Sequence, residues 1–499
     1  MKGVIAHLRV AVIGSGFSGL GLAIRLRQEG IEDFLVFERA EAIGGTWRDN
    51  TYPGCACDVM SLLYSYSFAP NPHWKTTFGK QHEILDYLEH CADRFGVRPH
   101  LRLGHELLAA RWDRLTRRWH LETSQGTWTA QILVSGTGYL SDPAIPELPG
   151  LDTFAGKMFH SAYWDHEYDL TGKRVAVIGT GASAIQFVPE IQKAVGRLDV
   201  YQRTAPWVGP KANKQISAAE HRRRTSVPGY QSFRRNFNKH GREIVAFLMK
   251  RPAVAAKTLQ GMAQKNLDQQ VKDPALRERL TPDYAVGCKR LLFSNTWYPA
   301  LQEPNVELVT DRIERVGPDS VFAGGQERKV DAIIFGTGFR ATDRPIAQRI
   351  QGRDGVRLSE AWRDGMSAYL GTTVSGFPNL FLMLGPNTAL GHSSQTVMIE
   401  AQIAYVLDAL RQIEKRGLAS VEIDARNQRD YNAKLDDGLA GTVWNAGNCR
   451  SWYLDANGRN PTIWPTYTWR FRRRTQRFDL SAYQVATSTG TTRLLEPTV

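Results

Sequence analysis

Cysteine and long apolar runs are both scarce in this chain. No apolar run approaches the roughly 20 residues of a transmembrane helix, so we expect no membrane span. The first strand-like run begins close to the start without a signal peptide before it, which predicts a reducing, cytoplasmic location. An odd and small number of cysteines does not indicate the disulfide framework of a small secreted protein. The five cysteines are Cys55, Cys57, Cys91, Cys288 and Cys449.

Acidic residues are fewer than basic ones, 50 against 63, which gives a net charge of +13. Excess positive charge favours anionic partners, either nucleic acid or anionic cofactors. The arginine triplets at 222–224 and 472–474 are isolated and no nucleic-acid-binding motif accompanies them, so we do not expect nucleic acid as a partner. A chain of 499 residues is too long to fold around a single hydrophobic core, so we expect two or three domains. We expect a monomer or a homodimer.

One short sequence occurs almost unchanged twice. VAVIGSG at residues 10–16 returns as VAVIGTG at residues 175–181. A β-branched run, a glycine turn and a helix start form a site where a pyrophosphate lies against backbone N–H groups. Two such motifs in one chain predict two bound dinucleotides. The residues expected to form the two turns are Gly14, Gly16, Gly19, Gly179, Gly181 and Ser183.

The charged residues that follow the two turns differ in sign. The strand-like run at 34–37 ends on Glu38, where a carboxylate accepts hydrogen bonds from ribose hydroxyls. The corresponding run at 198–202 ends on Arg203 and Thr204, and an arginine there binds a 2′-phosphate. The first site is therefore predicted to hold FAD or NAD, and the second NADP. Each charge taken alone is also compatible with a solvated strand end.

A second pair of similar segments indicates two related units. ILVSGTGY at 132–139 resembles AIIFGTGF at 332–339, which suggests that one unit is inserted in the other. We expect an α/β fold of two nested Rossmann-like dinucleotide-binding domains with a helical insertion, which is either a lid or an inert packing element. The aromatic tail from about residue 445 is expected in the core or an interface, and the second option is that it lines a substrate pocket. The expected boundaries are 1–148 and 343–499 for the FAD domain, 149–210 and 285–342 for the NADP domain, and 211–284 for the insertion.

The segment between the two units reads FAGKMFHSAYWD at residues 154–165. This spacing, F-x-G-x-x-x-H-x-x-x-W-D, resembles the fingerprint of the type I Baeyer–Villiger monooxygenases, class B flavoproteins in the superfamily of the flavin-containing monooxygenases. On this resemblance His160 and Trp164 belong to a linker that couples NADPH binding to domain arrangement. Further segments that fit the same family are GGTW at 44–47, YPG at 52–54, CKR at 288–290, GTGF at 336–339 and FPNLF at 377–381.

The resemblance implies FAD in the first site and NADPH in the second. NADPH reduces the flavin, which reacts with O₂ to give a C4a-peroxide; this attacks a ketone, and the adduct rearranges to an ester or lactone. The implied partners are a small ketone and O₂, and no metal is expected. Lys289 would join Arg203 and Thr204 at the NADP phosphate. The residues expected on the flavin side are Gly45, Thr46, Trp47 and Asp58.

Arg290 and Asp58 are the expected catalytic residues. An anionic peroxide and a tetrahedral adduct in a water-poor cleft need a fixed cation, and an arginine stays charged and offers a fork of donors. Asp58 would pair with Arg290 and orient it. From the residues alone, an ordinary ion pair between domains is an equal alternative.

Three other functions are compatible with the sequence. An N- or S-oxygenating flavin-containing monooxygenase uses a protonated hydroperoxide, whereas the arginine and the Trp164-Asp165 ending favour the ketone reaction. A pyridine-nucleotide disulfide reductase has four residues between its redox cysteines, but a single residue separates Cys55 from Cys57. A protein that binds its cofactors without turnover is the third alternative.

Overall fold

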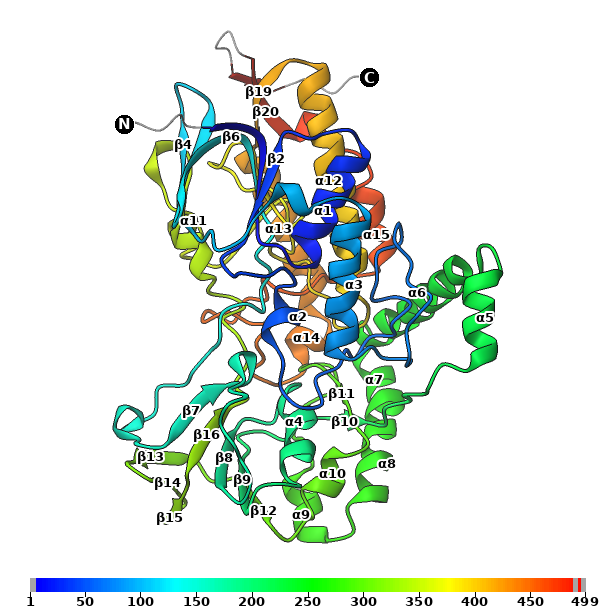
Figure 1. Ribbon diagram of the computed structural model, residues 1–499, viewed down its shortest axis with the longest axis vertical. Helices are drawn as coiled ribbons and strands as arrows, with labels where there is room; N and C mark the ends of the chain where they lie inside the picture. The colour runs from blue at the N-terminus through cyan, green and yellow to red at the C-terminus, as the bar shows by residue number, and fades with distance from the viewer. Residues whose placement is uncertain (1–5, 488–491, 495–499) are drawn as a thin grey trace.

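The computed structural model describes residues 6–487 and 492–494. Figure 1 shows two strand-rich halves, one above the other, with a helical arm at the side. Each half contains a sheet, and one strand of each sheet leads directly into one of the two glycine turns. The chain builds part of the upper half, then the lower half and the arm, and finally returns to the upper half.

The upper sheet is built around β1 (Ala6–Ile13), which pairs in parallel with β2 (Phe34–Phe37) and β6 (Gly126–Ser135). Val10 and Val12 are fully buried, as expected of a strand with parallel neighbours on both sides. The strand order is β17-β4-β5-β6-β1-β2-β3, and β18 also pairs with β6. The other strands are β3 (Leu101–Arg102), β4 (Leu107–Asp113), β5 (Arg118–Thr123), β17 (Ile350–Gln351) and β18 (Leu380–Leu382).

The lower sheet is wholly parallel, with the order β12-β9-β8-β16-β7. Its strands are β7 (Lys157–His160), β8 (Arg174–Ile178), β9 (Arg197–Tyr201), β12 (Val306–Val309) and β16 (Ala332–Phe335). Helix α4 (Ala184–Ile191) follows β8, and α10 (Trp297–Ala300) packs against it. A separate antiparallel sheet consists of β13 (Ile313–Gly317), β14 (Ser320–Ala323) and β15 (Gln326–Lys329).

Helices α1 (Phe17–Gln28) and α12 (Gln395–Lys415) pack against each other in the upper half. Gly21 permits this contact, because a Cβ there would lie 3.1 Å from Cδ1 of Ile403. No helix among the described residues is long and apolar enough to span a membrane. The upper half is completed by α2 (Thr46–Asp49), α3 (Gln81–Arg94), α11 (Leu358–Ala361), α13 (Ala425–Ala440), α14 (Val443–Ala446), α15 (Thr468–Arg474), β19 (Leu418–Ile423), β20 (Tyr483–Thr487) and β21 (Thr492–Leu494).

The helical arm lies between β10 (Val208–Gly209) and β11 (Leu292–Phe293). These two strands pair in parallel, so both ends of the arm leave the body at one place. In Figure 1 α5 projects at the edge of the molecule, and α6 leads back toward its centre. The helices of the arm are α5 (Ala218–Ser226), α6 (Tyr230–Met249), α7 (Pro252–Ala255), α8 (Gly261–Gln270) and α9 (Pro274–Arg279).

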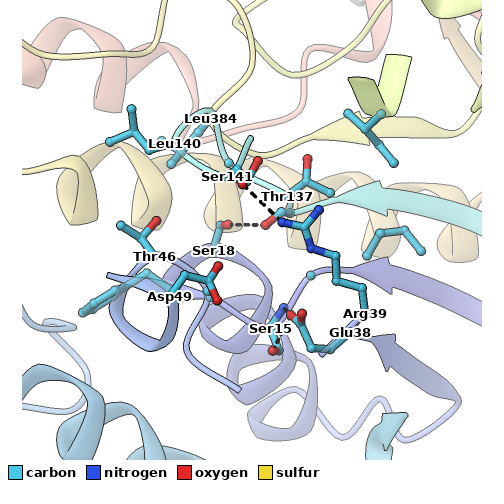
Figure 2. Close-up of a pocket in the computed structure, with 18 of the residues that line it drawn as sticks. Ser15, Ser18, Glu38, Arg39, Thr46, Asp49, Thr137, Leu140, Ser141 and Leu384 are labelled. Carbon is cyan, nitrogen blue, oxygen red and sulfur yellow. Dashed lines mark hydrogen bonds between the residues drawn. The ribbon is translucent and has the colours of Figure 1, made fainter. Parts of the chain in front are cut away.

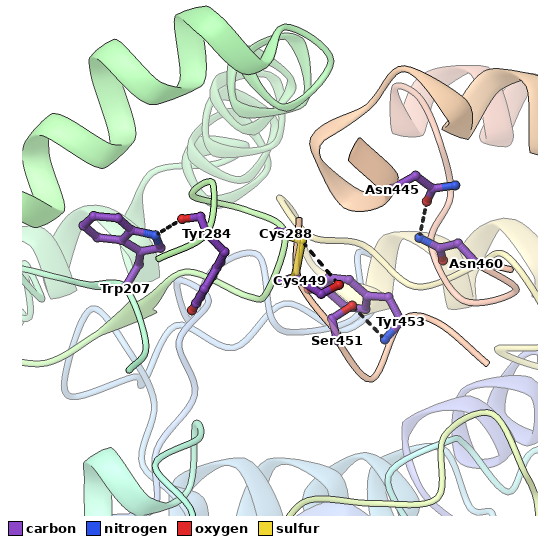
Figure 3. Close-up of a disulfide and its surroundings, with 8 residues drawn as sticks. All are labelled: Trp207, Tyr284, Cys288, Asn445, Cys449, Ser451, Tyr453 and Asn460. Carbon is purple, nitrogen blue, oxygen red and sulfur yellow. Dashed lines mark hydrogen bonds between the residues drawn. A yellow bond between two sulfur atoms is a disulfide. The ribbon is translucent and has the colours of Figure 1, made fainter. Parts of the chain in front are cut away.

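A disulfide joins Cys288 to Cys449 across 161 residues of sequence. It fastens the end of the helical arm to the aromatic C-terminal segment (Figure 3). Neither the small, odd number of cysteines nor the expected reducing location predicted this bond, because pairing over such a separation depends on the fold and not on spacing. Tyr453 and Trp464 of the aromatic segment are buried, which places them in the core, whereas Trp452 is exposed.

Candidate active site

The first glycine turn connects β1 to α1 and leaves no room for a side chain at Gly14 or Gly19. Gly14 has a φ of +95°, and a Cβ there would lie 2.8 Å from the carbonyl oxygen of Gly136. A Cβ on Gly19 would lie 1.9 Å from the carbonyl oxygen of Gly14. Gly16 is the N-cap of α1 and provides no side-chain cap. The first N–H groups of α1 therefore face an anion site of the kind that binds a pyrophosphate.

A groove runs from this turn past the segment at 44–49 to the loop at 136–142. Gly16 and Gly45 form a narrow point in it, because a Cβ on Gly45 would lie 3.2 Å from the Cα of Gly16. Gly45 has a φ of +52°, a conformation that favours glycine. A glycine-lined groove that starts at a helix N-terminus fits a dinucleotide such as FAD.

Glu38 lines the groove where the sequence predicts a ribose-binding carboxylate. Its Oε2 accepts hydrogen bonds from the N–H and the hydroxyl of Ser15, at 3.0 and 2.7 Å (Figure 2). Its Oε1 accepts from the N–H of Ala40 at 3.1 Å and lies 3.0 Å from Nη1 of Arg48. Protein donors thus occupy the four acceptor positions of the carboxylate. Its two bonds to Ser15 hold the glycine turn in place. Ribose binding by Glu38 stays a prediction.

The two walls of the groove are tied together by side chains. Arg39 donates a hydrogen bond to the carbonyl oxygen of Ser141 at 3.2 Å (Figure 2). Trp47 and its neighbour Thr46 line the opposite end. The Nε1–H of Trp47 donates to the hydroxyl of Tyr64 at 3.1 Å, which fixes the indole ring. Thr46 and Trp47 therefore lie where a bound dinucleotide would run.

The second turn repeats this geometry between β8 and α4. Gly179 has a φ of +107°, and a Cβ there would lie 2.5 Å from the carbonyl oxygen of Gly336. Gly181 is exposed, and a Cβ there would have its nearest neighbour at 3.9 Å. Ser183 is the N-cap of α4 and makes no side-chain cap. The N–H groups at the start of α4 are thus open to a second pyrophosphate.

Arg203 and Lys289 lie close together although 86 residues separate them in sequence. Partial burial and the nearby Arg203 both lower the pKa of the Lys289 ammonium. The Lys289 ammonium also lies 4.9 Å from the ring centre of Tyr284. Two neighbouring cations favour an anion between them, such as a 2′-phosphate. Thr204 is half-buried, and its carbonyl oxygen accepts a bond from Thr180 at 3.4 Å.

Helix α4 of the lower half docks on the segment at 52–58 of the upper half. The Gln186 side chain accepts bonds from the Tyr52 hydroxyl and the Ala56 N–H, each 3.2 Å, and donates to the Ala56 carbonyl oxygen at 3.0 Å. Gly54 lets the segment approach, because a Cβ there would lie 2.8 Å from the Gln186 carbonyl oxygen. This contact places Asp58 at the junction of the two halves.

Asp58 meets Arg290 at this junction. Nε and Nη2 of Arg290 each donate to one carboxylate oxygen of Asp58, both at 2.8 Å. Nη1 of Arg290 donates to the Leu390 carbonyl oxygen at 3.4 Å. Three of the five guanidinium N–H groups are thus used within the described residues, which leaves two for a ligand. The side chains of Arg290 and Asp58 are 27% and 26% exposed, so the pair is accessible.

Both members of the pair are ionised. Burial alone would raise the pKa of Asp58, but Arg290, Lys211 and Arg242 bring it below its ordinary value. The negative charge of Asp58 outweighs burial and raises the pKa of Arg290. A bidentate, charge-assisted pair of this kind holds the guanidinium in one orientation.

Three polar side chains near this pair were not predicted as site residues. The buried hydroxyl of Tyr453 and both ring nitrogens of buried His392 lack a hydrogen-bond partner among the described residues. Arg242 of α6 lowers the pKa of Asp58 and therefore also lies nearby. Tyr453 belongs to the aromatic tail, and His392 lies in a loop without a motif, so nothing local in the sequence distinguished them.

The fingerprint segment packs at the edge of the lower sheet. Nδ1 of His160, at the end of β7, accepts the Ala162 N–H at 3.1 Å. Burial lowers the pKa of His160 to about 4, so the ring is neutral near pH 7. The Trp164 ring lies 5.1 Å from Phe159 and 5.3 Å from Phe187 of α4. This packing accords with a linker role, which stays a prediction.

The fold and the two glycine turns define a protein with two Rossmann-like dinucleotide-binding domains. A family model described as flavin-binding monooxygenase-like matches residues 7–220. A Baeyer–Villiger monooxygenase of Streptomyces coelicolor is 53% identical over 96% of this chain and 93% of its own length. Another, from Pseudomonas aeruginosa, is 51% identical over 97% of this chain and 92% of its own. The chain belongs to the Baeyer–Villiger monooxygenases.

Solved structures agree with this assignment. A steroid monooxygenase bound to NADP is 29% identical, with a TM-score of 0.86 over 97% of this chain and 100% of that one. A closed cyclohexanone monooxygenase is 26% identical with the same TM-score and coverage. The structure named OTEMO, in complex with FAD and NADP, is 27% identical with a TM-score of 0.86 over 97% and 100%. The predicted family, fold class and enzyme class are confirmed, and the cofactors named are those predicted.

Proposed function

We propose that the protein uses NADPH and O₂ to insert one oxygen atom next to the carbonyl group of a small ketone, giving an ester or lactone. The bidentate pair of Asp58 and Arg290 supports this reaction most directly. Each dinucleotide-binding half contributes one member of the pair, so it lies where two bound cofactors would meet. The names of the relatives support the same reaction type.

We infer that FAD lies in the groove of the upper half, and NADPH on the turn of the lower half. Bound FAD supplies the chemistry that reduces and activates O₂. The FAD pyrophosphate would lie against the start of α1, and that of NADPH against the start of α4. The inferred FAD residues are Gly14, Gly16, Gly19, Glu38, Gly45, Thr46, Trp47 and Asp58, and the inferred NADPH residues are Gly179, Gly181, Ser183, Arg203, Thr204 and Lys289.

Arg290 provides a fixed positive charge and two N–H donors that have no partner among the described residues. Negative charge develops on the carbonyl oxygen as the ketone is attacked, and a preorganised cation stabilises it without rearrangement during the reaction. Asp58 keeps the guanidinium plane fixed through two parallel hydrogen bonds. Because both groups are ionised, this arrangement persists throughout the neutral pH range.

We also propose the domain boundaries stated above. Every strand of the lower sheet falls within 149–210 or 285–342, and every strand of the upper sheet within 1–148 or 343–499. Helices α5 to α9 fall within 211–284. A cytoplasmic location and a monomeric or homodimeric state remain proposals, and size-exclusion chromatography with light scattering decides the second.

Product analysis tests the proposed reaction. The purified, FAD-loaded protein is given NADPH in air with a panel of linear, cyclic and aryl ketones, and the products are identified by mass spectrometry with ¹⁸O₂. We expect an ester or lactone that contains one labelled oxygen. Labelled sulfoxides or N-oxides without any ester, from added sulfides or amines, would assign the chain to heteroatom oxygenation instead.

A further inference from the structure

One face of α6 is turned toward the Asp58–Arg290 pair. Residues seven apart on a helix share a face, because seven residues make nearly two turns. Arg235, Arg242 and Met249 form such a row along α6. Arg235, at its start, donates from Nη1 to the carbonyl oxygens of Leu62, Leu63 and Ser65, at 3.1, 3.1 and 2.6 Å.

The other end of the row packs against Gly287, which precedes Arg290 by three residues. Met249 is 3% exposed, and a Cβ on Gly287 would lie 2.5 Å from its Sδ. The opposite face of α6 points to solvent, since three apolar side chains along it are 64–66% exposed, namely Phe233, Phe237 and Ile244. Arg242, midway in the row, therefore points into the molecule, between the segment at 62–65 and Gly287.

Arg242 makes no hydrogen bond or ion pair within residues 6–487 and 492–494. Its neighbour Glu243 is turned away, since it accepts the backbone N–H of Thr468 at 3.2 Å. Burial lowers the pKa of Arg242, while Asp58 raises it and Arg290 lowers it. Arg242 therefore lies close enough to interact electrostatically with both members of the pair. Asp58 already forms two hydrogen bonds with Arg290, so its single negative charge is shared between two guanidinium groups.

The remaining neighbours do not neutralise Arg242 either. His392 is 4% exposed, and both its ring nitrogens lack partners in the described part of the chain. Burial and the charge of Arg242 lower the pKa of His392 to about 3, so the imidazole is neutral. Lys211, which also lowers the pKa of Asp58, adds a further positive charge. Three cations thus surround one carboxylate, and a partly buried charge of this kind needs an anionic partner.

We propose that Arg242 binds a carboxylate of the substrate, so that the enzyme prefers oxo acids in which the carboxylate is separated from the ketone carbonyl. The proposal rests on the proposed function and assigns a substrate class to the same site. The anions of FAD and NADPH are assigned to the starts of α1 and α4 and to Arg203 and Lys289. A carboxylate is the group that a planar guanidinium matches with two parallel hydrogen bonds.

The geometry separates the two ends of such a substrate. Arg290 directs its free N–H groups to the reacting carbonyl, while Arg242 enters from a different element, the helical arm. The carbonyl and the carboxylate therefore bind two different arginines. The neutral imidazole of His392 and the hydroxyl of Tyr453 offer further hydrogen bonds to the substrate oxygens. The arm then contributes to specificity and is more than a packing element.

Two matched pairs of ketones test this proposal, namely levulinate with its methyl ester, and para-acetylbenzoate with its methyl ester. The ratio of kcat/KM for acid over ester is measured for the wild type, Arg242→Gln and Arg242→Lys. Arg223→Gln is the control, because it removes an exposed charge from the same arm. We expect the wild type and the control to prefer the acids, and Arg242→Gln to lower the ratio about 10- to 150-fold, mainly through KM. Arg242→Lys should restore part of it.

A binding measurement separates this proposal from the reaction itself. The acids are titrated into oxidised, FAD-loaded protein without NADPH, and the change in the flavin spectrum gives Kd. We expect weaker binding in Arg242→Gln only. Equal ratios in the wild type and Arg242→Gln, or equal losses for acid and ester, would overturn the role of Arg242 while esters still form. If the acids bind through Arg242 but no ester forms from any ketone, the proposed function is wrong instead.

Discussion

Asp58 and Arg290 are 232 residues apart in sequence and are joined by two hydrogen bonds of 2.8 Å at the junction of the two dinucleotide-binding halves. The pair depends on two local features. Gly54 lets the segment of Asp58 approach α4, and Gln186 of α4 binds that segment through three hydrogen bonds. The contact that docks the two halves on each other therefore also positions Asp58, and Asp58 orients the catalytic Arg290.

Asp58→Asn removes the charge of this partner and keeps its shape. The asparagine cannot accept two charge-assisted bonds, so Arg290 loses its fixed orientation. We expect reduction of the flavin by NADPH to stay near the wild-type rate, while the ester formed per NADPH falls by a factor of about 10 to 100. Hydrogen peroxide released per NADPH should rise correspondingly. An unchanged yield of ester would show that Asp58 does not orient Arg290.

The same pair predicts the pH dependence of stability. The pKa of Asp58 in the folded protein is lowered, because Arg290 and its cationic neighbours outweigh burial. The stabilisation is therefore fully present above the ordinary carboxyl pKa of about 4 and is lost as the pH falls through the lowered value. Urea unfolding of the wild type and Asp58→Asn should differ at pH 7 and converge in acid. A difference that persists unchanged to pH 2 would contradict this account.

Arg203→Ala tests the assignment of NADPH to the second turn. Only NADPH has the 2′-phosphate, so the variant should bind NADPH about 10- to 150-fold more weakly, which corresponds to a lost charged hydrogen bond of about 1.5–3 kcal/mol. NADH provides the internal control, because its affinity should change little. Titration of the oxidised and reduced nucleotides gives both constants. Equal weakening of NADH and NADPH would place the phosphate elsewhere.

The disulfide between Cys288 and Cys449 closes a loop of 161 residues. In the chain-entropy model a closed loop of this length stabilises the folded protein by about 5 kcal/mol, an upper figure for a two-domain protein. We expect a reductant to raise the number of titratable thiols in the denatured protein from three to five. The melting temperature should fall at the same time.

Cys288→Ser with Cys449→Ser serves as the control for this prediction. The double variant should melt at the temperature of the reduced wild type, and added reductant should not lower it further. Cys55, Cys57 and Cys91 are free and buried, so they stay unchanged in both proteins. A wild type whose melting temperature does not respond to reductant would show that the bond does not contribute to stability.

Features that depend on short sequence spacing were readable from the sequence. The glycine turns and the sheets built on them follow from backbone geometry within a few residues. The position of Glu38 at the end of β2 was readable in the same way, but its occupied acceptor positions were not, because they depend on Ser15 and Arg48 in the folded chain.

Features that depend on long-range contacts were not readable from composition or periodicity. The pairing of Asp58 with Arg290 entered through a family resemblance, and the residues alone left an ordinary ion pair equally open. The disulfide joins two segments that only the fold brings together. Arg242 had one weak local signal, its seven-residue spacing from Arg235, but which face of α6 points inward follows only from the contacts at both ends of the helix.

The most direct test of the account is rapid kinetics and product analysis of Arg290→Ala. Flavin reduction by NADPH is measured without oxygen, and ester formation is then measured in air with a ketone that the wild type converts. We predict that the variant keeps FAD and is reduced by NADPH, but forms at least about 100-fold less ester, since it lacks the cation that stabilises charge on oxygen. Ester formation at close to the wild-type rate would contradict the central claim and leave Arg290 as a structural ion-pair residue.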